Sequence, residues 1–167
     1  MPMTSPDAPF IISSTLTFQN AMGSLLDYVF GGVFERFPEL RVAYSEGQAG
    51  WLPYILERSD KLWEERLLDT TGFGSKLALP PSSYMKQNVW YCVFDDETAM
   101  RNRDVIGIDR LTFEVDYPHA DSTFPHTKDV AERMAAKAGL NEYEANRFFR
   151  GNAIELYKLD TYYGITA

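Results

Sequence analysis

Segments with a helical pattern alternate with segments with a strand pattern along this chain, and that order limits the fold more than any other feature. Apolar side chains at three- and four-residue steps predict helices over residues 15–37, 51–68, 95–106, 127–138, 141–150 and 152–159. Short apolar and aromatic runs predict strands over residues 40–46, 88–94 and 111–116. Strands separated by helices pair in parallel through right-handed crossovers. We therefore predict an α/β fold with a parallel sheet of three strands.

Loops and caps separate these elements. Three prolines indicate a loop over residues 1–14, and Gly, Pro and Ser indicate another over residues 69–84. Gly31-Gly32 is expected to kink the first helix and Pro38 to end it. Asn141 with Glu144 resembles a capping box, and Gly151 is a suitable C-terminal cap.

Three parallel strands are too few to close a sheet. A barrel needs about eight, and an open sheet leaves two strand edges bare. The 167 residues have the length of a single domain or of part of one, and 45% hydrophobic content is enough for a core. We expect either a missing N-terminal half or self-association into a homo-oligomer.

The segment over residues 111–125, LTFEVDYPHADSTFP, concentrates the reactive side chains. Because alternate side chains of a strand share a face, Thr112, Glu114 and Asp116 are expected to point one way, opposite the apolar positions. Asp116 ends the strand, and His119 follows in the loop. In α/β folds the loops at the carboxyl ends of the strands form the active site.

Charge and hydropathy exclude several classes of partner. A net charge of −8 argues against nucleic acid and against anionic membrane surfaces, since both need a basic face. The sequence has no apolar run of 18 residues and no signal-peptide pattern at its start, so we expect neither a membrane span nor a signal peptide. The single cysteine, Cys92, favours a cytoplasmic location.

Three segments together resemble the C-terminal half of a known family. They are SEGQAGWLPYILERSDKLWEE, FEVDYPHADSTFPHT and RGNAIELYKLD. This combination is similar to the amidohydrolase-related family, in the branch of the aminocarboxymuconate semialdehyde decarboxylase-like enzymes. The resemblance implies that residues 1–167 are the C-terminal portion of a single metal-dependent TIM-barrel domain, with strands six to eight of the barrel. It also implies hydrolysis of C–N or C–O bonds, or decarboxylation of small, often aromatic, acids, and both reactions stay open.

The resemblance implies a site for Zn²⁺ or Mn²⁺ as well. The family's eighth-strand aspartate maps onto Asp116, which would bind the ion and accept a proton from a bound water. The family's HxH pair and fifth-strand histidine have no counterpart here, since His119 and His126 both follow the last strand. Where better-known members end the sixth strand with histidine, this chain has Glu46, and a carboxylate can also bind such ions. We therefore expect the ion in the full-length enzyme but not in this chain alone.

Several residues keep two interpretations. Glu114 either orients a ligand or the substrate, or is an interior acid paired with a lysine or arginine. His119 either binds substrate and relays a proton, or is a loop histidine bonded to backbone. Asp95 and Asp96 are a carboxylate pair, of which at least one is expected to cap the next helix. Structural roles are expected for His126, Cys92 and the three tryptophans Trp51, Trp63 and Trp90.

Two functional hypotheses follow. The first is a metal-dependent hydrolase or carboxy-lyase in which Asp116 and Glu46 bind the metal ion and His119 is catalytic. The second is a catalytically inactive fragment or pseudo-enzyme that acts only as an association module. An HxH motif encoded upstream of Met1 would favour the first.

Overall fold

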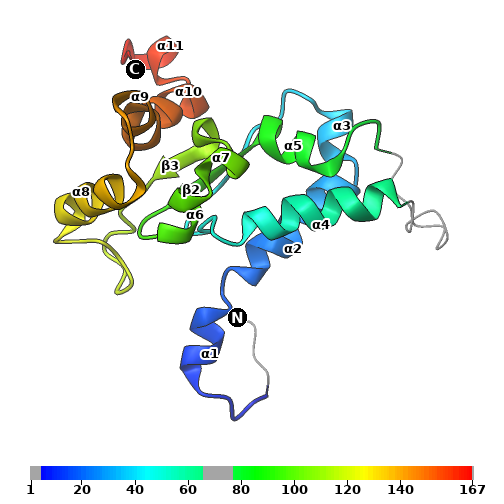
Figure 1. Ribbon diagram of the computed structural model, residues 1–167, viewed down its shortest axis with the longest axis horizontal. Helices are drawn as coiled ribbons and strands as arrows, with labels where there is room; N and C mark the ends of the chain where they lie inside the picture. The colour runs from blue at the N-terminus through cyan, green and yellow to red at the C-terminus, as the bar shows by residue number, and fades with distance from the viewer. Residues whose placement is uncertain (1–4, 66–76, 167) are drawn as a thin grey trace.

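A parallel sheet of three strands lies at the centre of the protein (Figure 1). The computed structural model describes residues 5–65 and 77–166. The strands are β1 (Val42–Tyr44), β2 (Val89–Val93) and β3 (Leu111–Phe113), and β2 lies in the middle. Ala43 pairs with Trp90 and Cys92 pairs with Thr112. The α/β class with a parallel sheet is therefore confirmed.

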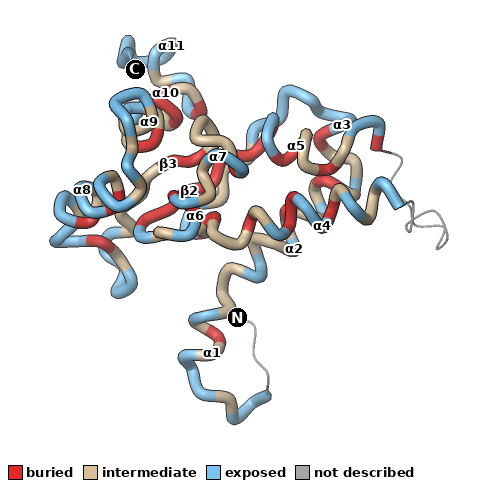
Figure 2. Tube along the Cα trace, viewed as in Figure 1, coloured by how far each residue is buried: buried red, intermediate tan, exposed pale blue. Residues whose placement is uncertain are grey.

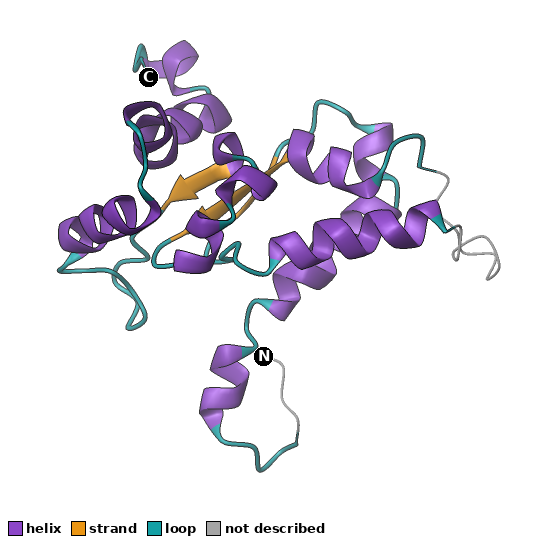
Figure 3. Cartoon of the chain, viewed as in Figure 1, coloured by secondary structure: helices purple, strands orange, loops and turns teal. Residues whose placement is uncertain are grey.

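Helices connect and surround the strands, and α1 projects away from the rest of the chain (Figures 1 and 3). In chain order they are α1 (Phe10–Thr15), α2 (Gln19–Phe30), α3 (Val33–Arg36), α4 (Leu52–Glu64), α5 (Pro81–Asn88), α6 (Glu97–Arg101), α7 (Arg103–Ile106), η2 (Ile108–Arg110), α8 (Thr127–Ala138), α9 (Glu142–Asn146), η3 (Arg147–Gly151), α10 (Asn152–Tyr157) and α11 (Leu159–Tyr163). None of the helices in the described ranges is both long enough and apolar enough to cross a lipid bilayer.

The two faces of the sheet have different environments. Val89, Tyr91 and Val93 of β2 belong to the main apolar core, which buried side chains of the surrounding helices complete. Figure 2 shows burial concentrated in β2 and β3 and along the inner sides of the helices. On the other face, Trp90 and Cys92 are also buried. A strand buried on both faces explains the continuous apolar run that predicted β2.

Three sequence-based predictions about the helices were wrong. Residues 15–37 form two helices rather than one kinked helix, because Gly32 adopts a left-handed conformation with φ 67° between α2 and α3. The predicted loop over residues 1–14 contains α1. Gly151 does not cap a helix; its φ of −59° is helical, and the chain continues through it into α10.

Helix α5 was also missed, within the loop predicted over residues 69–84. Residues 69–76 of that loop lie outside the described residues, but Pro81 begins α5. The start of this helix is held by Asp60 of α4, whose carboxylate accepts the Ser82 main-chain N–H at 2.8 Å and the Ser82 hydroxyl at 2.6 Å. Because this cap comes from another helix, the local sequence shows only the proline at the first helical position.

Two predicted caps are present. The Asn141 side chain accepts the Glu144 N–H and the Glu144 side chain accepts the Asn141 N–H, both at 3.0 Å. Asp96 caps α6 through the Ala99 N–H at 2.9 Å. Asp95 instead forms an ion pair with Arg133.

Asp96 does more than cap a helix. Its second carboxylate oxygen accepts the main-chain N–H groups of Ala49 at 2.9 Å and Gly50 at 2.7 Å. A Cβ at Gly50 would lie 2.7 Å from the other Asp96 oxygen, so only glycine permits this approach. Asp96 therefore joins the loop after β2 to the turn after β1.

Replacing Asp96 is expected to destabilise the fold. Asp96→Ala removes one cap and two charge-assisted hydrogen bonds, and we expect the free energy of unfolding to fall by about 3 kcal/mol. The matched control is Asp95→Ala, which removes an ion pair between side chains that are each 42% exposed and should cost less than about 1 kcal/mol. Urea unfolding of both variants checks this, and equal stabilities would contradict it.

Self-association also remains a prediction. Within the described ranges, β1 and β3 each pair with β2 alone, and Phe10 and Ile11 of α1 are about 70% exposed. Open strand edges and exposed apolar side chains favour association. We expect sedimentation velocity to show species larger than 19.1 kDa that grow with protein concentration. A single monomeric species across the concentration range would refute it.

Candidate metal centre

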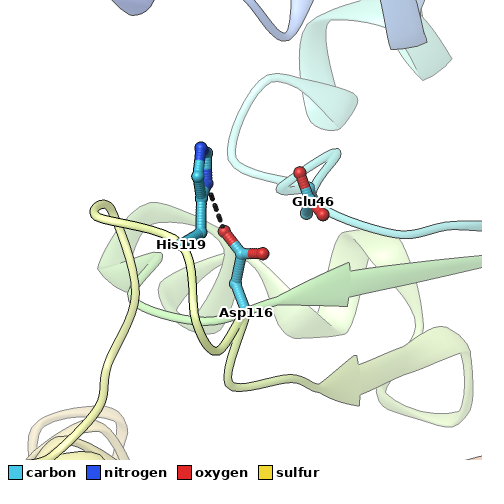
Figure 4. Close-up of side chains that lie close together, drawn as sticks. All are labelled: Glu46, Asp116 and His119. Carbon is cyan, nitrogen blue, oxygen red and sulfur yellow. Dashed lines mark hydrogen bonds and ion pairs between the residues drawn. The ribbon is translucent and has the colours of Figure 1, made fainter.

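Three polar side chains meet at the carboxyl ends of β1 and β3. Glu46 lies in the turn after β1, and Asp116 and His119 lie in the loop after β3. Figure 4 shows the Asp116 carboxylate between the His119 ring and Glu46. Each residue offers one potential ligand atom, and these atoms all lie within 4.8 Å of one another. The structure thus brings together Glu46, Asp116 and His119 as the sequence predicted, although it does not test the roles assigned to them.

The Glu46 turn has an unusual main-chain conformation. Glu46 has φ 55° and Gln48 has φ 49°, both in the left-handed region that side chains other than glycine rarely adopt. The turn is held by Asp96, as described above, and by the Trp51 indole, which donates to the Gly47 carbonyl at 2.9 Å. Trp51 therefore stabilises the turn through its indole N–H in addition to packing against the core.

The strand predicted over residues 111–116 ends earlier, at Phe113, so Asp116 lies in the loop after it rather than at its last position. Asp116 is in the left-handed region, with φ 58°. The alternating faces predicted for residues 111–116 therefore end before Asp116. The loop that follows is closed at both ends: the His119 N–H donates to the Asp116 carbonyl at 2.9 Å, and the N–H of buried Thr123 donates to the Val115 carbonyl at 3.1 Å. The loop thereby fixes the position of His119 relative to Asp116.

Asp116 and His119 form a hydrogen-bonded ion pair. The Nδ1 atom of His119 lies 2.9 Å from Oδ2 of Asp116. The His119 side chain is 63% exposed, whereas the Asp116 side chain is 11% exposed. The hydrogen bond to the Asp116 carboxylate raises the pKa of His119 above its ordinary value, and the charge of that carboxylate adds to the effect. The second ring nitrogen of His119 points away from Asp116 (Figure 4).

Glu114 has a partner that neither sequence interpretation named. One of its carboxylate oxygens accepts the main-chain N–H of Glu46 at 2.5 Å. No lysine or arginine of the described residues forms an ion pair with it, so the interpretation as a conventionally paired interior acid is wrong. Burial raises the pKa of Glu114, the bond from Glu46 opposes this, and the nearby charges of Glu46 and Asp116 raise it further.

The three convergent groups fit a divalent cation. Two carboxylate oxygens and one imidazole nitrogen are ligand types that suit Mn²⁺ and Zn²⁺. The centre is also strongly anionic, with the carboxylates of Glu46, Asp116 and Glu114 close together and His119 as the cationic partner of one of them. The sequence had named only Glu46 and Asp116 as ligands. The His119 imidazole can bind an ion only in its neutral form, whereas its pair with Asp116 favours the protonated form.

An open cavity of about 350 Å³ adjoins the three groups. Aromatic residues of the cavity are Phe10 of α1, Phe18 just before α2, and Phe94 after β2. A larger cavity of about 600 Å³ includes Arg41, which precedes β1 at the amino end of the sheet, and none of the candidate site residues lines it. A further cavity of about 350 Å³ is lined by Glu46 but by neither Asp116 nor His119. The cavity lined by Phe10 and Phe94 is therefore the one that adjoins all three groups.

Sequence reasoning missed Phe10, Phe18 and Phe94 as cavity residues. Phe10 lay in a predicted loop and Phe18 in a helix expected to be core, and no local pattern places them near Asp116.

The remaining candidates are structural or distant from the cluster. Cys92 is a buried thiol that accepts a hydrogen bond from Thr112 at 3.0 Å, and His126 is exposed beside Asp129. Trp90 is buried, while Trp51 and Trp63 are only partly buried against the core.

A family model described as amidohydrolase matches residues 5–159, which is most of the chain. The chain belongs to the amidohydrolase family. An amidohydrolase fold of this kind places its chemistry at the carboxyl ends of the strands, where Glu46 and Asp116 lie.

Solved structures support the same fold. The amidohydrolase chain is 23% identical to 5-carboxyvanillate decarboxylase LigW from Sphingomonas paucimobilis, with a TM-score of 0.68, covering 83% of this chain and 39% of that one. It is 23% identical to a dihydroxybenzoic acid decarboxylase from Polaromonas sp. JS666, whose structure contains manganese and the inhibitor 2-nitroresorcinol. The TM-score is 0.67, and the match covers 86% of this chain and 41% of that one. It is 26% identical to a 5-carboxyvanillate decarboxylase from Novosphingobium aromaticivorans, complexed with manganese and 4-hydroxy-3-methoxy-5-nitrobenzoic acid. The TM-score is 0.60, and the match covers 83% of this chain and 38% of that one. The chain spans about two fifths of the length of these relatives. The partial-barrel prediction is thus confirmed.

The His119–Asp116 pair gives a pH-dependent prediction. Because the pKa of His119 is raised in the folded protein, the pair stabilises the fold below about pH 6.5, and this stabilisation is lost as the pH rises through the raised value. Asp116→Asn should lower the pKa of His119. Titration of the His119 ring proton by NMR in both proteins measures this, and an identical midpoint in the variant would contradict the pairing.

Proposed function

We propose that this amidohydrolase chain carries part of the divalent-metal centre of an enzyme that removes a carboxyl group from a small aromatic acid. The observation that carries the proposal is the convergence of Glu46, Asp116 and His119 beside a cavity with an aromatic wall. Hydrolysis of a small amide or ester at the same centre is the second candidate, since it would use the same carboxylates.

Glu46 and Asp116 would hold the ion, because their carboxylates come from two different strand ends and face one space. A bound Mn²⁺ or Zn²⁺ would polarise substrate oxygens as a Lewis acid. Manganese is named in two of the solved relatives, which favours Mn²⁺ over Zn²⁺ for this chain as well. Only an ion or a hydrogen-bond donor can lie between the two carboxylates without repulsion.

The cavity supports an aromatic substrate. Phe10, Phe18 and Phe94 offer apolar and aromatic surface on one side, and Glu46 and Asp116 offer the polar side. A benzoic acid has an apolar ring that suits the aromatic side, and its anionic carboxylate would approach Glu46 and Asp116 only through a bound cation. A cavity of about 350 Å³ lies at the small end of the usual range for ligand sites.

His119 supplies the proton that this reaction needs. When the bond between the ring carbon and the carboxylate breaks, its electron pair stays on the carbon, carbon dioxide leaves, and one proton must reach that carbon. Asp116 keeps His119 protonated to higher pH than an isolated histidine. The exposed imidazole lines the cavity, so it can deliver this proton as a general acid.

We further propose that residues 1–167 are the C-terminal portion of a single barrel domain. Three strands and about two fifths of the relatives' length support this view. The HxH pair and fifth-strand histidine expected from the family would then come from residues beyond this chain. An inactive association module is the less favoured hypothesis, because it gives no reason for three ligand groups to meet beside a cavity.

Substitution of Asp116 tests the function. In the protein that contains these residues together with an upstream HxH segment, we expect Mn²⁺-dependent release of carbon dioxide from hydroxybenzoic acids. Residues that hydrogen-bond to metal ligands typically change activity by roughly 10–100-fold when replaced. Asp116→Asn should lower kcat by more than this, because Asp116 would itself be a ligand. Asp129→Asn, an exposed carboxylate on α8, is the matched control and should leave kcat unchanged.

Two results would contradict the proposal. One is full activity of Asp116→Asn; the other is a gene that starts at Met1 with no HxH segment on any partner chain. For the 167 residues alone we expect weak Mn²⁺ binding or none, and no turnover, measured by electron paramagnetic resonance and carbon dioxide release. If carbon dioxide is not released but an amide or ester is cleaved with the same Asp116 dependence, hydrolysis is the reaction.

A further inference from the structure

We propose that Glu114 is a positioning residue that sets the metal-binding orientation of Glu46 by accepting its main-chain N–H. This inference rests on the proposed function, because it assigns Glu114 a role in the same metal centre. Glu114 acts through Glu46 and not on the ion or the substrate.

The contact joins two strand ends that are far apart in sequence. Glu114 follows β3, Glu46 follows β1, and β2 lies between these strands. The donor–acceptor distance is 2.5 Å, and the two residues are separated by 68 positions. The Glu114 N–H continues the ladder with the Val93 carbonyl at 3.0 Å, so the Glu114 main chain is fixed by β2. A side chain anchored in this way can hold the turn after β1 at a constant position.

The conformation of Glu46 makes this contact necessary. With φ 55°, Glu46 has left the strand, and its N–H is directed to the Glu114 carboxylate. A left-handed conformation at a non-glycine residue is strained and persists when surrounding contacts enforce it. Asp96 and Trp51 fix the far end of the turn at residues 47–50. The hydrogen bond to Glu114 fixes the other end of the turn, at the Glu46 main chain from which the Glu46 carboxylate extends.

Glu114 itself lies outside the ligand group. Among the described residues, the set of ligand atoms within 4.8 Å of one another contains Glu46, Asp116 and His119. Glu114 is half-buried, and one of its oxygens is engaged by the main chain. A carboxylate that accepts an N–H here can be replaced by an amide, because the Gln side-chain carbonyl also accepts a hydrogen bond.

This equivalence gives a sharp test. Glu114→Gln keeps the acceptor and removes the charge, whereas Glu114→Ala removes both. We expect Glu114→Ala to weaken Mn²⁺ binding about 10-fold or more and to increase hydrogen exchange of the Glu46 amide. Glu114→Gln should stay within about threefold of the unchanged protein in both measurements. Glu57→Ala, an exposed acid on α4, controls for the loss of one negative charge.

Mn²⁺ affinity is measured by electron paramagnetic resonance, and Glu46 amide exchange by NMR without metal. Two results overturn the inference: Glu114→Gln as impaired as Glu114→Ala, which would mean that Glu114 acts through its charge, or an unchanged Mn²⁺ affinity in Glu114→Ala. These measurements use the protein that contains these residues together with an upstream HxH segment; if that protein without substitutions binds no Mn²⁺, the proposed function fails instead. The amide exchange then still decides whether Glu114 holds Glu46, since that measurement requires no ion.

Discussion

The turn after β1 depends on carboxylates that accept main-chain N–H groups. Asp96 binds the N–H groups of Ala49 and Gly50 from the loop after β2, and Glu114 binds that of Glu46 from the end of β3. Each strand of the sheet therefore contributes to the shape of one short turn. Hydrogen bonds to charged acceptors are shorter and stronger than neutral ones. They can therefore hold a conformation that residues other than glycine avoid, and Glu46 extends from that conformation toward Asp116.

The charged groups at the two ends of the sheet have different partners. At the amino end, the guanidinium groups of Arg41 and Arg110 lie over the Trp90 ring, at 5.5 and 4.4 Å from its centre. Arg110 also donates to the Lys86 carbonyl at 2.6 Å, and Arg41 donates to the Glu155 carbonyl at 2.8 Å. These cations are occupied by packing and main-chain contacts. At the carboxyl end, Glu114 accepts a main-chain N–H and Asp116 pairs with His119. The described residues provide no hydrogen-bond or ion-pair partner for the Glu46 carboxylate, so this end holds a less compensated group of acids.

The sequence predicted the sheet and its acids because both follow from local patterns. Strand positions follow from apolar runs, and the carboxyl ends of parallel strands necessarily lie on one side, which places Glu46 near Asp116. Local patterns could not reveal contacts between distant segments. Helix α5 is capped by Asp60 of α4, Glu114 is paired with the main chain of Glu46, and Phe10 reaches the cavity from a segment predicted to be a loop. The left-handed conformations of Glu46 and Asp116 were equally hidden, since neither residue is a glycine.

The unfavourable features of the site have a common physical reason. Glu46 and Asp116 both occupy the left-handed region, and their carboxylates lie close together and close to Glu114. Each feature lowers stability, because like charges repel and such conformations are strained. A proton on His119 relieves the repulsion only in part, since it pairs with Asp116 alone. A divalent cation between Glu46 and Asp116 would relieve more of it, and its affinity would gain from a turn that is already in place before binding. A bound ion would then compensate for the strain and the repulsion that these residues introduce into the fold.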